Sequence, residues 1–129
     1  MSKKNVSTFM LRQRAFLKLY MITLVEREKW YGLEILDYLR KEFEQFGYRP
    51  YHSEIYKSLH ELMDDGILAR YKRVKEGADL QEVVYYKFQD YEKAKLYKKQ
   101  LKAELERCIG LLQKAVRDNY GHSLKTEKK

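Results

Sequence analysis

The last third of the chain carries the feature that most restricts its fold, an apolar stripe at helical spacing. Its members follow one another in steps of three or four: Ala94, Tyr97, Leu101, Leu105, Cys108, Leu112 and Ala115. That spacing predicts a helix over 91–120, on the order of 40 Å long. A domain of about 85 residues is only about 25–30 Å across, so this helix has to extend past it. We expect the stripe to pair with the same stripe of a second copy; the alternative is that the helix folds back over its own domain.

Earlier patterns predict three shorter helices and a β-hairpin. Apolar residues recur at helical spacing over 9–25, 33–46 and 53–63, with Ser53 as a candidate N-cap of the third helix. Asp64-Asp65-Gly66 is typical of a helix end. Two β-branched and aromatic runs, 67–74 and 82–88, flank a Gly-containing loop at 75–79, which predicts a hairpin, and Asp90 can cap the last helix.

This order of elements predicts an α+β winged helix, a three-helix bundle plus a β-hairpin wing, with a long C-terminal dimerisation helix. We expect a flexible basic arm over 1–8, a winged-helix DNA-binding domain over 9–90, the dimerisation helix over 91–120 and a polar tail over 121–129. The predicted dimer interface consists of Tyr97, Leu101, Leu105, Cys108 and Leu112.

Composition narrows the class of protein. With 129 residues the chain supports one compact domain, and its single cysteine excludes an internal disulfide framework and a Cys-rich zinc module. No apolar run approaches the roughly 20 residues of a membrane span, so we expect a cytoplasmic, nucleoid-associated protein. The net charge of +8 favours a polyanionic partner. The charge is uneven, however, because residues 51–90 hold six basic and eight acidic groups. We therefore expect cations placed at chosen points rather than an even basic coat.

The third helix and the hairpin hold the candidate DNA contacts. Burying Ile55, Leu59, Leu62 and Met63 leaves the polar side chains of Glu54, Tyr56, Lys57 and His60 on the outer side, where they can bond base edges in a major groove. The hairpin carries the basic run Arg70-x-Lys72-Arg73-x-Lys75 toward its tip, and the arm carries two lysines. A charged helix face is often merely solvated, and lysines often protect edge strands. The conjunction of element order, basic hairpin, basic arm and dimer helix favours double-stranded DNA as the partner.

Other chemistries fit poorly. His52 and His60 are eight residues apart with no third ligand nearby, so we expect no metal and no other cofactor. The sequence holds no Gly-rich phosphate loop and no nucleophile elbow. Cys108 falls inside the apolar stripe, so we interpret it as a small core residue. We therefore predict that the protein is not an enzyme.

Six collinear stretches resemble the Bacillus-type replication terminator proteins. They are Gln13–Ile22, Tyr31-Gly32-Leu33, Ser58–Leu62, Asp64–Leu68, Leu80–Val84 and Lys95–Lys102. The resemblance covers about residues 9–120. A looser similarity, in the Tyr-Gly-Leu and Leu-x-x-Leu-x-x-x-Gly-Ile-Leu patterns, links the chain to PadR-like winged-helix regulators.

The resemblance implies a bacterial homodimer that binds replication terminator sites, two dimers side by side on one site, and halts the replication fork from one direction as a contrahelicase. It implies groove contacts by Arg49, His52, Ser53, Tyr56, Lys57 and His60, and backbone contacts by Arg14, Lys72, Arg73 and Lys75. It also implies a surface for arrest of the replicative helicase at Glu28, Trp30 and Tyr31.

Two alternatives remain open at this point. A PadR-like transcriptional repressor would share the architecture but answer to an effector at promoters. A protein-interaction adaptor would use the basic face to bind an acidic partner.

Overall fold

The computed structural model describes residues 9–74 and 81–121. The chain forms two compact units, residues 12–98 and residues 1–11 with 99–129. The first unit contains the three-helix bundle, the hairpin and the start of the long last helix, and the second contains most of that helix.

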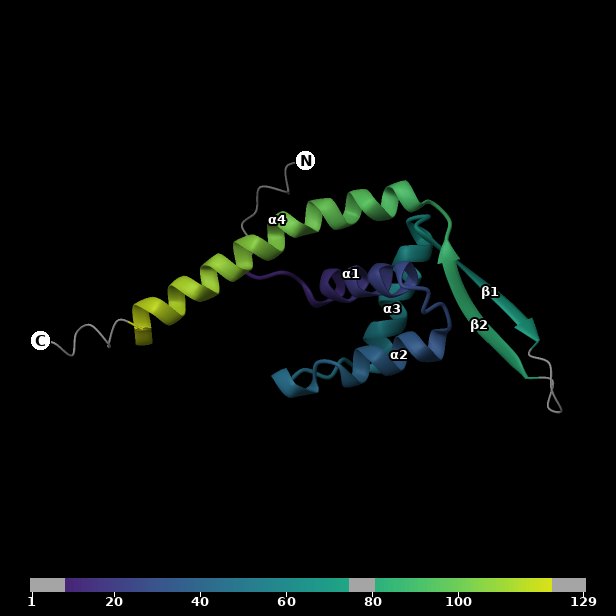
Figure 1. Ribbon diagram of the computed structural model, residues 1–129, viewed down its shortest axis with the longest axis horizontal. Coiled ribbons are helices and arrows are strands. Elements are labelled where there is room, and N and C mark those ends of the chain that lie inside the picture. Colours follow the sequence, from purple (N-terminus) through teal and green to yellow (C-terminus); the bar gives the residue numbers. More distant parts are fainter. Residues whose placement is uncertain (1–8, 75–80, 122–129) are drawn as a thin grey trace, which may run out of the picture. The chain divides into compact units, whose positions relative to one another are not determined.

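The larger unit is a winged helix, as the element order predicts (Figure 1). Its helices are α1 (Gln13–Glu26), α2 (Gly32–Lys41) and α3 (His52–Asp64), with a short 3₁₀ turn η2 (Glu44–Phe46) after α2. The strands β1 (Leu68–Val74) and β2 (Glu82–Phe88) form an antiparallel hairpin, with Leu68 opposite Phe88 and Val74 opposite Glu82. The expected hairpin loop lies outside the described residues.

Three helix starts or ends differ from the sequence expectation. Helix α1 begins at Gln13 instead of residue 9, because Phe9 is exposed and supplies no packing that would hold a further turn. Helix α2 ends at Lys41, since Phe43 leaves the helical conformation and turns into the core. Helix α3 begins at His52 after the extended Tyr51, which forms no side-chain cap. The expectation that Ser53 caps this helix was therefore wrong.

Two turn predictions are confirmed. Gly66 follows α3 with φ of +76°, a left-handed conformation that favours glycine, so the chain leaves the helix at once. Asp90 caps the last helix, because its carboxylate accepts a hydrogen bond of 3.1 Å from the Lys93 amide.

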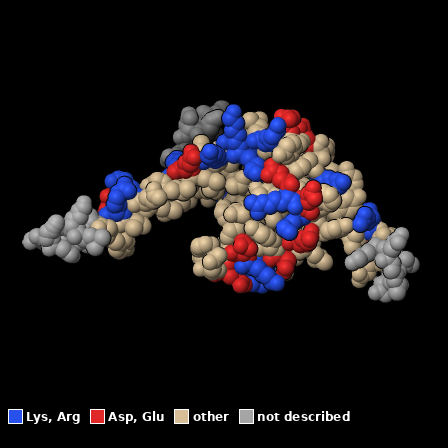
Figure 2. Space-filling model, in the orientation of Figure 1, with Lys and Arg blue, Asp and Glu red and all other residues tan. Residues whose placement is uncertain are grey.

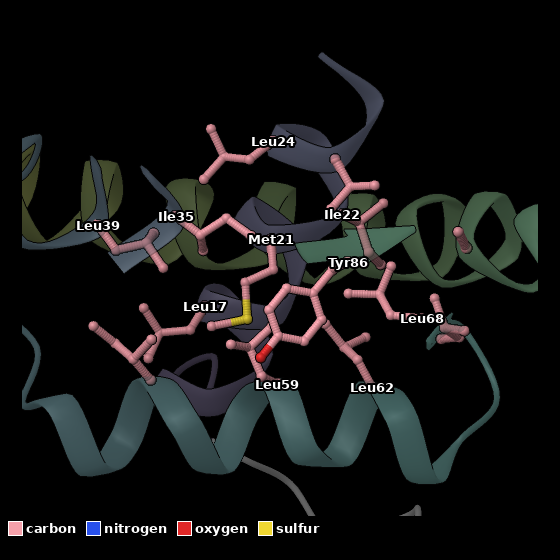
Figure 3. Close-up of a cluster of buried hydrophobic side chains, with 14 of the residues drawn as sticks. Leu17, Met21, Ile22, Leu24, Ile35, Leu39, Leu59, Leu62, Leu68 and Tyr86 are labelled. Carbon is pink, nitrogen blue, oxygen red and sulfur yellow. The ribbon is translucent and has the colours of Figure 1, made fainter. Parts of the chain in front are cut away.

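The core of this unit lies between the three helices and the base of the hairpin (Figure 3). Leu17, Met21 and Ile22 of α1 meet Leu59 and Leu62 of α3, and all five are at most 2 % exposed. Met63 is only half-buried, whereas the hydroxyl-bearing Ser58 is fully buried and donates a 2.8 Å hydrogen bond to the Glu54 carbonyl. The buried face of α3 is thus rotated slightly toward Ser58, compared with the predicted stripe.

The long helix α4 runs without interruption over Tyr91–Val116 and ends in a π-helical turn, η3 (Arg117–Gly121). It matches the helix predicted over 91–120. Gly110 leaves it unbroken, although glycine weakens a helix by roughly 1 kcal/mol relative to alanine.

Candidate nucleic-acid interface

The exposed face of α3 brings together five of the groove contacts expected from the sequence. His52, Ser53, Tyr56, Lys57 and His60 are all exposed on this helix. The buried residues Ile55, Leu59 and Leu62 occupy its other side and fix it to the core. Steps of four residues link His52, Tyr56 and His60, and steps of four and three link Ser53, Lys57 and His60, so the five side chains form one continuous polar surface along the helix.

Arg49 precedes this helix and is half-exposed. Its guanidinium pairs with the Glu44 carboxylate of η2. The Arg40 carbonyl also accepts a 3.5 Å hydrogen bond from it. These contacts hold the Arg49 guanidinium against the end of α2 and η2, and Arg49 lines a surface pocket together with His52.

The hairpin carries exposed cations on β1. Arg70, Lys72 and Arg73 are all exposed, and Lys75 lies outside the described residues. Arg73 donates a 2.9 Å hydrogen bond to the Tyr31 hydroxyl and lies 6.0 Å from the centroids of the Tyr31 and Tyr85 rings. Arg73, an expected contact to the DNA backbone, therefore bonds Tyr31, a residue of the expected arrest surface.

The expected arrest surface lies between α1 and α2. Glu28 is exposed and adopts φ of +63°, a conformation that costs a non-glycine residue about 1–2 kcal/mol. The Trp30 carbonyl accepts a 2.8 Å hydrogen bond from the Tyr86 amide, and Lys87 lies 4.8 Å from the Trp30 ring. Tyr31 forms an antiparallel bridge with Tyr85. Trp30 and Tyr31 thus extend the hairpin sheet, an attachment that local sequence patterns do not reveal.

A cleft of about 930 Å³ opens between the start of α2, α3 and the hairpin. Tyr31, Tyr56 and Tyr86 line it together with Leu59 and Arg70. Burial is the main cause that raises the pKa of Tyr86, and the nearby Arg70 guanidinium opposes this shift. The cleft joins the exposed face of α3 to the hairpin, and only the tertiary structure assembles it.

Arg14 lies on α1 and faces α3 instead of open solvent. Its Nε lies 2.8 Å from a Glu54 carboxylate oxygen, and its Nη1 lies 2.7 Å from a Glu61 carboxylate oxygen. Hydrogen bonds to Glu54 and then Glu61 raise the pKa of Arg14 above its ordinary value. Glu54, which we expected to face the major groove, is therefore engaged by α1. A clue was present in the sequence, because Glu54, Glu61 and Asp65 recur at helical spacing.

The long helix carries an exposed apolar stripe in the second unit. Ile109, Leu112 and Val116 are each more than half exposed, and Leu105 is half-buried. Steps of four, three and four residues place these four side chains on one face. Of these four, only Leu105 and Leu112 were expected in the interface. The expected interface residues Leu101 and Cys108 are buried in the single chain. Tyr97 packs on the winged-helix core, and its hydroxyl donates a 3.4 Å hydrogen bond to the Ala15 carbonyl.

Charge on the surface is mixed. Figure 2 shows acidic and basic side chains interspersed over the face in view. Within residues 9–74 and 81–121, no three His, Cys, Asp or Glu side chains are grouped so that they could hold a metal ion. In the same ranges, every helix is too short or too polar to cross a membrane.

Comparison with known proteins adds independent findings. The family model for replication terminator proteins matches residues 8–120. Replication termination proteins of Bacillus subtilis and Bacillus spizizenii are 60% identical over 118 residues, which cover 92% of this chain and 97% of each relative.

Solved structures of more distant proteins show the same fold. A transcriptional regulator from Clostridium thermocellum aligns with a TM-score of 0.55 at 20% identity, over 83% of this chain and 95% of its own. A proposed transcriptional regulator from Thermoplasma acidophilum aligns with a TM-score of 0.52 at 20% identity, over 81% and 90%. These similarities support the winged-helix assignment.

Proposed function

The chain belongs to the replication terminator protein family, and from this premise we propose that it is a cytoplasmic homodimer that binds double-stranded terminator DNA and blocks the replication fork from one direction. The observation that carries the proposal is the polar row on α3, exposed beside a cationic hairpin in a chain that is 60% identical to replication termination proteins. The fold and the family thus point to the same partner.

In this proposal α3 enters the major groove. His52, Ser53, Tyr56, Lys57 and His60 face the base edges, and Arg49 flanks them. A side chain that forms two hydrogen bonds with one base discriminates against the wrong base by about 1–3 kcal/mol. The surface of α3 is large enough for several such contacts, which favours sequence-specific binding.

The hairpin supplies the sequence-independent part of the affinity. Lys72 and Arg73 reach the DNA backbone in this arrangement, and Lys75 continues the same basic run. Each neutralised phosphate releases counterions, so the affinity falls as salt rises. An adaptor for an acidic protein would lack the discrimination between base sequences that α3 supplies.

Dimerisation uses the exposed stripe of α4. Leu105, Ile109, Leu112 and Val116 leave apolar surface in water in the single chain. A second copy presents the same stripe, and an isologous contact covers both. Two linked α3 helices then read two half-sites, and two dimers side by side occupy one terminator site.

Fork arrest uses the surface at Glu28, Trp30 and Tyr31. The positive φ of Glu28 presents its carboxylate on an exposed turn. Trp30 and Tyr31 are fixed to the hairpin by a hydrogen bond and a strand bridge. A rigid surface attached to the DNA-bound hairpin is suited to meet the replicative helicase as it arrives.

A fork-arrest assay tests this proposal. The DNA site is the duplex that the wild-type protein enriches from a randomised pool, placed in a replicating template in each orientation. We expect arrest in one orientation. Lys57→Ala and Arg49→Ala are expected to weaken binding to the enriched site more than to random DNA, and equal losses on both would contradict the role of α3.

A PadR-like repressor is the second candidate, favoured by the transcriptional regulators among the structural neighbours. It shares the α3 reading face and the dimer. Arrest in neither orientation, together with tight binding to a promoter-like site, would place this function first.

A further inference from the structure

The rotation of α3 about its own axis decides which side chains face the DNA. At about 100° per residue, three stripes share the helix surface. The polar row with Tyr56, Lys57 and His60 forms one, and the apolar row with Ile55, Leu59 and Leu62 forms another. The third is acidic, with Glu54, Glu61 and Asp65 at spacings of seven and four residues.

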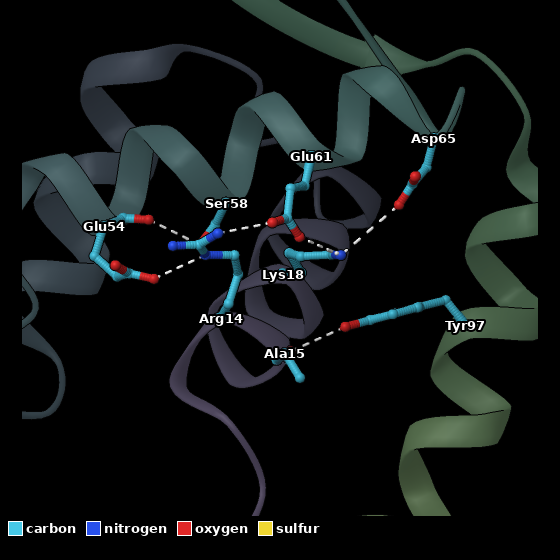
Figure 4. Close-up of polar contacts among 8 residues, drawn as sticks. All are labelled: Arg14, Ala15, Lys18, Glu54, Ser58, Glu61, Asp65 and Tyr97. Carbon is cyan, nitrogen blue, oxygen red and sulfur yellow. Dashed lines mark hydrogen bonds and ion pairs between the residues drawn. The ribbon is translucent and has the colours of Figure 1, made fainter. Parts of the chain in front are cut away.

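The acidic stripe is clamped by two cations of α1 (Figure 4). Arg14 spans two turns of α3, with contacts of 2.8 Å to Glu54 and 2.7 Å to Glu61. Lys18, four residues further along α1, lies 3.0 Å from the second oxygen of Glu61 and 3.7 Å from Asp65. Both helices therefore present complementary charges along their line of contact.

These contacts restrain α3 in a way that its apolar contacts do not. Apolar burial is non-directional, so Ile55, Leu59 and Leu62 hold α3 against the core without a directional bond that sets its rotation. A guanidinium that bonds two carboxylates through separate nitrogen atoms has a fixed geometry, which resists such a rotation. Lys18 is only 9% exposed, and a buried ammonium is stable only when paired, so Glu61 is held firmly in place.

The same contacts remove an electrostatic problem. Unpaired, the acidic stripe would set negative charges beside the face that meets a polyanion. Its Glu61 carboxylate is held ionised, because hydrogen bonds from Arg14 and then Lys18 lower the pKa of Glu61. Arg14 and Lys18 neutralise the stripe within the fold.

We propose that Arg14, supported by Lys18, is a positioning residue that sets the rotation of α3 for sequence reading, and that it acts through Glu54 and Glu61 instead of contacting phosphate. The proposal rests on the proposed DNA-binding function. A phosphate approaching Arg14 would meet the two carboxylates that already occupy its Nε and Nη1, so the geometry favours the role inside the protein.

Glu61→Gln separates the two roles, because they predict opposite results. Removal of a negative charge beside DNA strengthens binding if electrostatics alone decide, and it frees Arg14 for a phosphate. If Arg14 positions α3, Glu61→Gln loosens the helix and weakens binding to the enriched duplex by about tenfold, the order lost with one mismatched base pair. Binding to random duplex stays equal or strengthens.

Arg14→Lys is the second variant. Lysine keeps the positive charge but lacks the two-pronged geometry that bridges Glu54 and Glu61. If Arg14 positions α3, the variant should lose discrimination between the enriched and the random duplex, while the dependence of affinity on salt between about 50 and 200 mM stays unchanged. If Arg14 contacts phosphate, the variant should retain its affinity for both duplexes. The Arg14→Lys, Glu61→Gln double variant is expected to discriminate between the enriched and the random duplex as well as the single variant with the poorer discrimination, because both changes break the same contact.

The matched control is Glu92→Gln, which breaks an exposed ion pair with Lys95 inside α4 and should leave the affinity for both duplexes unchanged. Thermal unfolding confirms that each variant is folded at the assay temperature. Amide chemical shifts of Ser53 and Tyr56 in the free protein give a readout without DNA: they should move in Glu61→Gln and stay fixed in Glu92→Gln. The positioning role of Arg14 would be overturned if the amide shifts stay fixed in Glu61→Gln, or if this variant binds the enriched duplex more tightly. If the wild-type protein enriches no duplex, the proposed DNA-binding function is overturned. The amide shifts of Glu61→Gln then decide the positioning role alone.

Discussion

Leu112→Asp should dissociate the dimer, and the structure gives the size of the effect. Leu112 is 51% exposed in the single chain. Full burial of a leucine side chain contributes about 1.5–3 kcal/mol, so covering the exposed half contributes about 1 kcal/mol. The dimer contains this residue twice, and its loss from both copies removes about 2 kcal/mol. Since roughly 1.4 kcal/mol is a tenfold change, the dissociation constant should rise about 30-fold or more.

The control lies on the opposite side of the same helix. Leu96 is 53% exposed and precedes Leu105 by nine residues, or about two and a half turns, so it points away from the stripe. Leu96→Asp introduces the same charge into the same helix at nearly the same exposure. Sedimentation equilibrium over a range of concentrations measures both dissociation constants. If Leu112→Asp dissociates no more readily than Leu96→Asp, the stripe is not the interface.

Four further substitutions test stability. Gly110→Ala should raise the free energy of unfolding by about 1 kcal/mol, because the site is helical and an added Cβ meets nothing within 4 Å. Gly47→Ala, equally open but at φ of +77°, should lower it by about 1 kcal/mol; denaturant titration compares the two, and equal effects would contradict the conformational argument. Hydrogen bonds from Arg14 and then Lys18 lower the pKa of Glu61 below its ordinary value of 4.5, so the stabilisation by the ionised carboxylate is present above that pH and disappears as pH falls. Glu61→Gln should therefore lose less stability on acidification than the wild type. Parallel curves of unfolding free energy against acidic pH for the two proteins would refute this. Burial raises the pKa of Tyr97 from 10.0 to about 12, so Tyr97 contributes to a loss of stability as pH rises between these values, and Tyr97→Phe should lose less stability there than the wild type; an unchanged alkaline limb in that variant would exclude Tyr97 as a cause.

The winged-helix fold could be predicted because its signals are local. The helical spacing of Ile55, Leu59 and Leu62, the β-branched runs and the turn at Gly66 each depend on residues close together in the chain. The family resemblance drew on the same information, and the family model and the Bacillus relatives confirm it. Errors concerned helix ends, where Phe9 and Ser53 lacked the tertiary contacts that their local pattern suggested, and the buried face of α3, which includes Ser58 while Met63 is only half-buried.

The residues of the candidate site could be predicted only in part from the sequence. The sequence marked Tyr56, Lys57 and His60 as outward-facing, because their positions alternate with buried ones at helical spacing. It also marked Glu54 as outward-facing, since a charged residue off the apolar stripe normally faces solvent. The partner that turns Glu54 inward is Arg14, forty residues earlier in the chain. Such a pairing depends on how two helices cross, which local periodicity does not encode.

The amino-acid sequence alone determined the order of the elements, the polar row of α3 and the apolar stripe of α4, since side chains on one element are arranged by the regular geometry of that element. Tertiary structure decided which charged groups remain available to a partner. It placed Arg14 and Lys18 against the acidic stripe, Arg73 against Tyr31, and Trp30 at the edge of the hairpin. Charged side chains at a helix surface pair with whatever the packing of neighbouring elements brings within a few ångströms, and that packing is a property of the whole fold.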